Sequence, residues 1–377
     1  MLTSTYQRLE HHNGTVRLTS ATIEPRPTGP TGPTGSVGSA GPAGSAGECS
    51  VLLAPAAIGV CRSDLREING TRHLRRDFGH EIVGTVVACR PEGLVPVGQR
   101  VVLDPHPRVR RTSGFAELVE IQGERAEVAA ALVPLPDDSP AVRSVFVEPL
   151  ACVCHCLSRL DEATRAAGAD PAGPVAVIGA GTAGALMAAV LSARSVPVTL
   201  VNRGRPRLDF LQERGVLPRT VLRTADETAG LTVPRAIVAT AAADTATLGL
   251  AARVVAPDGL VLLYAGTQPG QAFADVDLDT LRREQLTARA ATDSKTFQLV
   301  GSHGATREDF TAAMDLLDPR TPQRRELGRR LDRMVTSVLP LAQGADLLNR
   351  LARGPFIGKP VLVPGRPYSD APQGAAS

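Results

Sequence analysis

The sequence predicts an α/β protein in which a mostly-β domain precedes a doubly wound parallel sheet. Short branched-apolar runs separated by Gly and Pro follow one another from residue 50 onward, as is typical of β-rich domains. From about residue 145 strand-like and helix-like stretches alternate, which indicates a parallel sheet with crossover helices. A chain of 377 residues is long enough for two such domains.

This change of pattern predicts three ranges. We expect the mostly-β domain over residues 1–160, the parallel-sheet domain over 161–325, and a return to the first domain, with a tail, over 326–377. Inside the first range, the segment 26–47 has Gly at every third position from Gly29 to Gly47. A collagen triple helix requires this period, but seven triplets without partner chains indicate a Gly/Pro-rich surface loop.

The individual elements follow in chain order. In the first domain the apolar runs at 51–60, 81–89, 99–104 and 116–122 are predicted strands. A long helix is predicted over 147–167, and a strand, a tight Gly turn, a helix and a second strand over 174–202. Further strands are expected at 235–241 and 259–266, and a helix at 345–353 between two apolar runs near the end.

The composition excludes several classes of function. The formal net charge of +3, scattered basic residues, and the absence of Trp argue against nucleic-acid binding. No apolar run approaches the roughly 20 residues that cross a bilayer, and the N-terminal residues do not resemble a secretory signal. Six cysteines without a secretory context indicate reduced thiols. We therefore expect a cytoplasmic protein with no membrane or nucleic-acid partner.

A Gly-rich motif predicts a nucleotide site in the second domain. It follows the apolar run VAVI and precedes a helical stretch, which is the context of the Rossmann dinucleotide fingerprint. The first Gly permits the turn, the second lets the backbone approach a pyrophosphate at the helix N-terminus, and the third allows close packing. The predicted cofactor-binding residues here are Gly179, Gly181, Thr182, Ala183 and Gly184.

The end of the second strand of this fold separates NAD from NADP. An acid there would bind the ribose 2′-hydroxyl, but the chain has Asn202, Arg203 and Arg205. Guanidinium groups form charge-assisted hydrogen bonds to phosphate, so we expect NADP(H). The alternatives are that both arginines are solvated surface cations, and that Asn202 serves either cofactor.

Three further motifs occur in the chain, two before and one at the start of the predicted long helix. They are Gly59-Val60-Cys61-Arg62-Ser63-Asp64-Leu65, Phe78-Gly79-His80-Glu81-Ile82-Val83-Gly84 and Val147-Glu148-Pro149-Leu150. With the Gly-rich motif they resemble the zinc-dependent medium-chain alcohol dehydrogenases, and most closely the sorbitol, polyol and threonine dehydrogenase-like branch. The resemblance covers residues 48–365, although it is dense only at the motifs. It implies a GroES-like catalytic domain followed by a Rossmann domain.

The resemblance also implies a catalytic site. Cys61, His80 and Glu148 are the implied zinc ligands; a Cys, a His and a carboxylate leave a tetrahedral zinc one open position for substrate. Glu81 is implied to neighbour the metal, Ser63 to relay a proton, and Asp64 to orient a ligand.

Each ligand assignment has a structural alternative. Cys61 could be an inert buried thiol, His80 a core histidine, and Glu148 an acid at a helix N-terminus. Arg62 places a cation beside Cys61, where it would influence substrate choice or lower the thiol pKa. The cluster Cys152, Cys154, His155 and Cys156 is predicted to be core rather than a metal site, since on a helix Cys152 and Cys156 share a face while Cys154 points elsewhere.

Departures from the family also carry predictions. Residues 104–120 contain none of the four cysteines that hold a structural zinc in many members, so only one, catalytic zinc is expected. The expected function is hydride transfer between NADP(H) and a secondary alcohol or ketone of a polyol, sugar or aminocyclitol. The Arg-rich composition, typical of a GC-rich genome, suggests ketone reduction in antibiotic (aminoglycoside-like) biosynthesis. The alternatives are a zinc-free quinone or enone reductase and a non-catalytic NADPH-binding protein. A homodimer or homotetramer is expected by resemblance.

Overall fold

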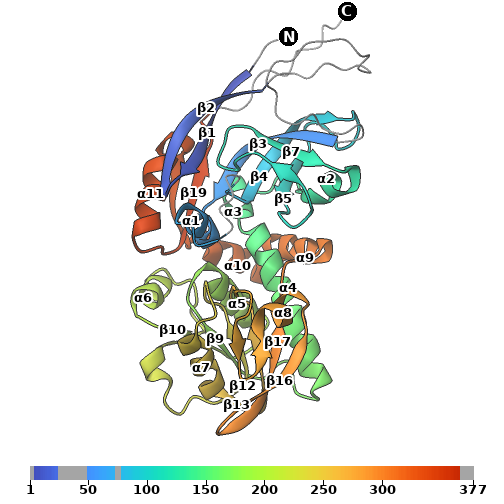
Figure 1. The fold of residues 1–377 in the computed structure, drawn as a ribbon. Coiled ribbons are helices and arrows are strands. Elements are labelled where there is room, and N and C mark those ends of the chain that lie inside the picture. Colours follow the sequence, from blue (N-terminus) through green and yellow to red (C-terminus); the bar gives the residue numbers. More distant parts are fainter. Residues whose placement is uncertain (1–3, 24–48, 73–77, 366–377) are drawn as a thin grey trace, which may run out of the picture. The chain divides into compact units, whose positions relative to one another are not determined.

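Two compact units share the chain in the computed structural model, which describes residues 4–23, 49–72 and 78–365 (Figure 1). Unit 1 comprises residues 1–141, 339–354 and 362–377, and unit 2 comprises 142–338 and 355–361. The long helix that we placed across the first domain boundary lies in unit 2. The Gly-triplet segment 26–47, predicted to be a surface loop, lies outside the described residues.

Unit 1 is mostly β. Its main strands pair antiparallel: β3 pairs with β4 and, through its first half, with β7, while β5 joins β4 to β8. Buried Val, Leu and Ile side chains of these strands form its core; burial alternates in the first part of β3, whereas consecutive residues are buried in β4 and β5. The elements are β1 (Ser4–His12), β2 (Thr15–Ile23), β3 (Cys49–Gly59), α1 (Arg62–Ile68), β4 (Glu81–Arg90), β5 (Arg100–Leu103), β6 (Arg110–Arg111), β7 (Val119–Gly123), α2 (Arg125–Ala131) and β8 (Leu132–Pro134), with α3 (Ala141–Ser144) at the unit boundary.

The N-terminal hairpin was not predicted. Strands β1 and β2 pair over their full length around Asn13 and Gly14, whose φ values are 48° and 76°. An Asn-Gly pair with both residues at positive φ is the preferred two-residue hairpin turn. Leu9 is fully buried, and its backbone N–H donates to the Phe115 carbonyl oxygen at 2.7 Å. The hairpin is therefore built onto the same core as β3–β8.

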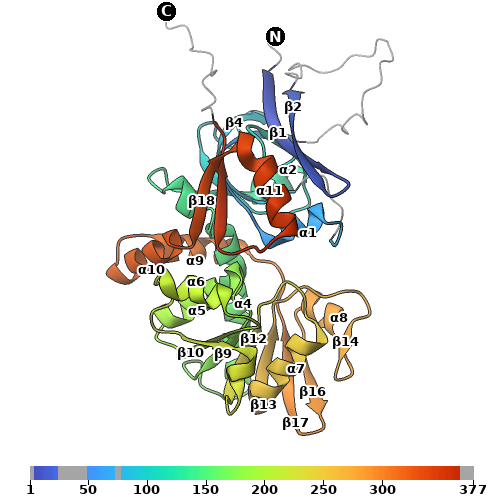
Figure 2. The same ribbon diagram turned by 90° about the vertical axis from the view of Figure 1, so that its left-hand side faces the viewer.

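The last part of the chain contributes to unit 1. The unit boundaries fall within β18 (Val335–Pro340) and β19 (Lys359–Val363), and between them lie η2 (Leu341–Gln343) and α11 (Gly344–Arg353). Figure 2 shows α11 alongside the hairpin, and helix α11 contacts both β2 and α1. The Asn349 side chain accepts from the Val16 N–H at 2.8 Å and donates to the Val16 carbonyl at 2.9 Å.

Unit 2 is a doubly wound sheet in the order β11-β10-β9-β12-β13-β17-β16. All neighbours pair in parallel except β16 and β17. Its elements are α4 (Val147–Ala166), β9 (Val175–Ile178), α5 (Thr182–Ala193), β10 (Val198–Asn202), α6 (Pro206–Glu213), β11 (Val221–Thr224), η1 (Ala225–Thr228), β12 (Val233–Val238), α7 (Thr245–Val254), β13 (Val255–Leu263), β14 (Ala272–Phe273), β15 (Val276–Asp277), α8 (Leu278–Arg283), β16 (Thr287–Thr292), β17 (Lys295–Gly301), α9 (Arg307–Leu317) and α10 (Pro322–Asp332).

The strand order reverses next to β9. The chain runs from β9 outward to β10 and β11, then returns to β12 on the other side of β9. In open α/β sheets ligands bind at the carboxyl ends of the strands at such a switch point. The Gly-rich motif follows β9 directly, so the fold places it at the expected binding edge.

Helix α4 is a core helix of unit 2. The stretch Ala141–Ala166 is long and apolar enough to cross a membrane by composition, but 67% of its most apolar window is buried within the protein. Cys154 and Cys156 are buried, and burial raises the pKa of the Cys154 thiol to about 11. His155 binds Asp309 of α9 through Nδ1 at 2.9 Å and Gln285 through Nε2 at 2.6 Å. Both ring nitrogens are thus engaged, as expected of core residues rather than of a metal cluster.

Candidate functional site

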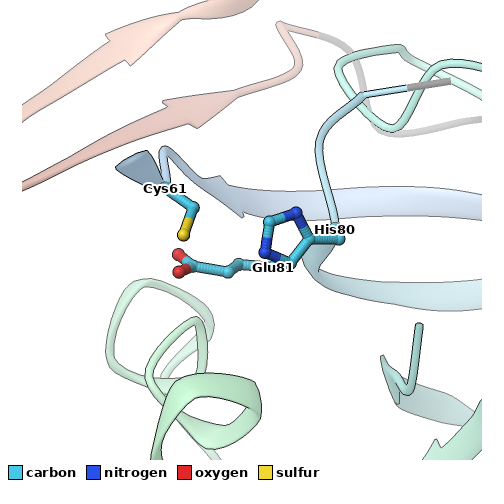
Figure 3. Close-up of side chains that lie close together, drawn as sticks. All are labelled: Cys61, His80 and Glu81. Atoms are coloured by element: carbon cyan, nitrogen blue, oxygen red, sulfur yellow. The ribbon is translucent and has the colours of Figure 1, made fainter. Parts of the chain in front are cut away.

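Cys61, His80 and Glu81 form a group of potential metal ligands in unit 1. Their donor atoms all lie within 4.8 Å of one another. Figure 3 shows the Cys61 sulfur and the Glu81 carboxylate pointing toward each other beside the His80 ring. Within the described part of the chain, this is the one such group of three or more His, Cys, Asp or Glu residues.

The position of Cys61 follows from the junction of β3 and α1. Strand β3 ends at Gly59, and Cys61 is the N-cap of α1 with extended backbone angles. The Cys61 backbone N–H donates to Asp64 Oδ2 at 2.9 Å, which closes the first turn. The cap therefore fixes the backbone of Cys61, a partly buried residue whose thiol belongs to the cluster.

Three glycines make room for the loop that carries His80 and Glu81. Gly59 stands opposite Glu81 in the β3–β4 register, and a Cβ at Gly59 would lie 2.2 Å from Glu81 Oε2. Gly79 has φ of 79°, a conformation that favours glycine. A Cβ at Gly114 would lie 2.0 Å from the Gly79 carbonyl oxygen. Sequence reasoning quoted Gly59 within a motif without giving it a role, and it missed Gly114, because both roles depend on contacts between distant segments.

Asp64 holds the imidazole of His80. Its Oδ1 lies 3.2 Å from His80 Nδ1 and accepts from the Gly79 N–H at 2.9 Å. Burial raises the pKa of Asp64, but the His80 charge and these hydrogen bonds outweigh it and lower the pKa overall. Burial likewise lowers the pKa of His80, whereas Asp64 raises it well above its usual value. With Nδ1 engaged, Nε2 is the nitrogen that remains for a metal.

Ser63 lies on the same side of the ring as that nitrogen. Its Oγ is 3.4 Å from His80 Nε2, so the hydroxyl is next to the converging donor atoms. A thiolate, an imidazole nitrogen and a carboxylate are the ligand types that zinc prefers. The residues present in unit 1 therefore fit a zinc ion.

Glu148, the third ligand implied by resemblance, belongs to unit 2. It lies in the first turn of α4 with 6% of its surface exposed. The Cys152 thiol, four residues along the helix, lies 3.8 Å from Glu148 Oε1. Its assignment to the metal stays a prediction.

The Gly-rich motif of unit 2 has the geometry that a pyrophosphate loop requires. Gly179 has φ of 115°, and a Cβ there would lie 2.9 Å from the Ala239 carbonyl oxygen. A Cβ at Gly184 would lie 1.8 Å from the Gly179 carbonyl oxygen, so the helix packs directly on the turn. Gly181, the N-cap of α5, faces open space instead. Thr182 and Ala183 follow it in the first turn.

The three predicted residues at the end of β10 differ in their contacts. The Asn202 side chain accepts from the Ala180 N–H at 3.1 Å and donates to the Gly204 carbonyl at 2.8 Å, so it ties the two loops together. Arg203 is exposed. Arg205 forms ion pairs with Asp209 at 3.3 Å and Glu227 at 3.4 Å. Sequence reasoning missed Glu227, which lies in η1, directly after β11.

Comparison with known proteins agrees with this organisation. The alcohol dehydrogenase GroES-like domain matches residues 47–134. The (R,R)-butanediol dehydrogenase of Neisseria gonorrhoeae is 31% identical over 159 residues, which are 37% of this chain and 42% of that protein. The sequence match thus spans less than half the length of this curated relative.

Solved structures share the fold over nearly the whole chain. S. aureus TarJ in complex with NADPH superposes with a TM-score of 0.64 at 16% identity, over 96% of this chain and 99% of TarJ. Galactitol-1-phosphate dehydrogenase from Escherichia coli gives a TM-score of 0.65 at 18% identity, over 95% of this chain and 100% of its own. The α/β fold with a GroES-like domain and a Rossmann-like parallel sheet is confirmed.

Proposed function

Because this chain has the fold of the medium-chain dehydrogenases and resembles their zinc-dependent polyol branch, we propose that it is a zinc-dependent, NADP(H)-dependent alcohol dehydrogenase. It transfers a hydride between the nicotinamide and a secondary alcohol or ketone of a polyol, sugar or aminocyclitol. The observation that carries the proposal is the convergence of Cys61, His80 and Glu81 with Ser63 beside them.

In the proposed metal site, Cys61, His80, Asp64 and Ser63 each have a task. The Cys61 thiolate and His80 Nε2 hold the zinc, which when bound supplies a Lewis acid for the substrate oxygen. Asp64 keeps the His80 ring oriented through Nδ1. Ser63 Oγ, 3.4 Å from Nε2, is placed to give or take the proton of the substrate hydroxyl.

The nucleotide site uses unit 2. The open space at Gly181 and the N-terminus of α5 accommodate the pyrophosphate. Asn202 shapes the loop by its hydrogen bonds to Ala180 and Gly204, and Arg203 and Arg205 supply the positive charge for a 2′-phosphate. Similarly folded proteins have been solved with NADPH (TarJ) and with NADH (rspB from E. coli), so the choice of cofactor rests on these two arginines.

The finer parts of the proposal rest on sequence and resemblance. A single catalytic zinc follows from the absence of cysteine between residues 104 and 120. We also propose that the substrates are small and polyol-like, and that the protein is a cytoplasmic homodimer or homotetramer. Its proposed role is ketone reduction in antibiotic biosynthesis. The zinc-free quinone or enone reductase and the non-catalytic NADPH-binding protein give no role to the Cys61–His80–Glu81 convergence.

Elemental analysis of metal tests the proposal first. We expect one zinc per chain in protein purified without chelator, and its loss in Cys61→Ser, because the thiolate is the strongest donor of the set. Comparing Glu148→Gln with Glu81→Gln identifies the carboxylate ligand, because only substitution of the ligand should cause loss of zinc. Protein without zinc that still binds NADPH would favour the zinc-free reductase.

Turnover separates the enzyme from a non-catalytic binding protein. NADPH oxidation with a panel of ketosugars and hydroxyketones should be measurable for wild type. In Ser63→Ala we expect kcat to fall by about 10²-fold or more, as for loss of a proton-transfer group, with zinc content unchanged. Wild-type activity in Ser63→Ala would remove Ser63 from the mechanism.

A further inference from the structure

An acid reaches the cofactor-selecting end of β10 from the short helix that follows the neighbouring strand. Strands β10 and β11 pair in parallel with Asn202 opposite Thr224. Glu227 follows Thr224 by three residues, in η1 (Ala225–Thr228). Since parallel strands end at the same edge of the sheet, Glu227 stands beside the position where this fold normally carries its ribose-binding acid.

The carboxylate of Glu227 is fixed by two contacts. Glu227 Oε2 accepts from the Thr224 N–H at 2.7 Å, as part of a capping box at the start of η1. The same oxygen lies 3.4 Å from Nη1 of Arg205. The Thr224 hydrogen bond, with smaller effects from Arg205 and Arg223, holds the pKa of Glu227 below its usual value, so the group is charged at neutral pH.

The contact between Glu227 and Arg205 reduces the positive charge available to a bound cofactor. Arg205 is shared between Glu227 and Asp209, so its positive charge is already partly neutralised. Among the described residues, Arg203 forms no ion pair within 4.0 Å, although hydrogen bonds and, to a smaller extent, its charge lower the pKa of Asp244. A phosphate at the ribose 2′ position, bearing close to two negative charges, would gain from Arg203 but would face the Glu227 carboxylate when it reached for Arg205.

We propose that Glu227 sets the preference of this protein between NADP(H) and NAD(H), by competing with the 2′-phosphate for Arg205. This inference rests on the proposed dinucleotide site. Glu227 is then a specificity-determining residue. Its carboxylate lowers the affinity for NADPH but leaves the affinity for NADH, which has an uncharged 2′-hydroxyl, almost unchanged.

The test is the substitution Glu227→Gln. Glutamine retains the capping-box hydrogen bond, because Gln serves at this position as Glu does, so the variant removes charge and little else. We expect the Kd of NADPH to fall by about tenfold at low salt, since one like charge near the phosphate is lost, and the Kd of NADH to change by less than about twofold. Equilibrium titration of nicotinamide fluorescence measures both constants without turnover.

A matched control is Glu326→Gln. Glu326 pairs with Arg329 and Arg330 on α10, so this variant removes an equivalent ion-paired charge elsewhere in unit 2. It should leave both affinities unchanged. The gain in Glu227→Gln should also shrink as ionic strength rises, because exposed charges are screened.

Three outcomes would overturn the inference. An unchanged ratio of the two constants in Glu227→Gln removes Glu227 as a determinant, although the proposed function stands. Selective weakening of NADH shows that Glu227 instead binds the ribose 2′-hydroxyl. Failure of wild-type protein to bind either dinucleotide overturns the proposed function and this inference together.

Discussion

Asp64 illustrates how one buried side chain organises a site at the scale of a residue. It accepts hydrogen bonds from the backbone of Cys61 and of Gly79, and it contacts His80 Nδ1. It therefore couples the segment that carries the thiol to the segment that carries the imidazole. Side chains that hydrogen-bond to metal ligands typically raise the metal affinity by about 10–100-fold.

We predict that Asp64→Asn lowers zinc affinity by about 10–100-fold. The amide retains the size of the side chain but loses the charge that favours the correct ring orientation. Competition with a chelator of known affinity measures the effect. Asp104→Asn is the control, because Asp104 contacts His106 Nδ1 in the same way, at 2.8 Å. Equal affinities in Asp64→Asn and wild type would show that Asp64 does not support the metal.

Which residues could be predicted depends on whether their partners are local. Cys61, Ser63 and Asp64 lie within four positions, and His80 adjoins Glu81, so short motifs made them candidates. Gly59 and Gly114 act through close approaches to residues 22 and 35 positions away, which no motif encodes. Glu227 became visible only when the β10–β11 register brought it next to Arg205.

At the scale of elements, the predicted helices and strands are those whose hydrophobic pattern lies entirely within the element itself. The helix over 147–167 is observed as α4, and the strand-turn-helix-strand over 174–202 as β9, α5 and β10. The hairpin β1–β2 and the short helix α1 were not predicted. Their formation depends on the Asn13–Gly14 turn and on the cap at Cys61, where a few residues decide the geometry.

The turn between β9 and α5 allows two glycine roles to be separated. We predict that Gly181→Ala leaves the melting temperature near that of wild type, because its Cβ would face open space at φ of −75°. We also predict that it weakens NADPH binding, by filling the space that we propose for the pyrophosphate. Gly184→Ala should instead destabilise the protein, since its Cβ would lie 1.8 Å from the Gly179 carbonyl oxygen.

Thermal unfolding and NADPH titration of both variants test this assignment. A stable Gly184→Ala would show that α5 can move away from the turn. Wild-type NADPH affinity in Gly181→Ala would place the pyrophosphate elsewhere.

At the scale of the whole molecule, the observed group of metal-binding side chains and the Gly-rich turn lie in different units, while the predicted ligand Glu148 lies in unit 2. The donor atoms of Cys61, His80 and Glu81 come from unit 1, and residues 179–184 from unit 2. The sequence predicted two domains, but the exact distribution of the C-terminal residues depends on contacts such as Asn349 to Val16, which are 333 positions apart.

This separation predicts that zinc and nucleotide binding can be lost independently. In Cys61→Ser we expect zinc to be lost while the Kd of NADPH changes by less than about twofold, because no cradle residue of unit 2 is altered. In Gly181→Ala we expect the reverse, with one zinc per chain and weakened NADPH binding. Elemental analysis and nicotinamide fluorescence on the same samples give both quantities. If Cys61→Ser also loses NADPH binding while keeping its melting temperature, the two sites are energetically coupled, and the metal contributes to holding the cofactor.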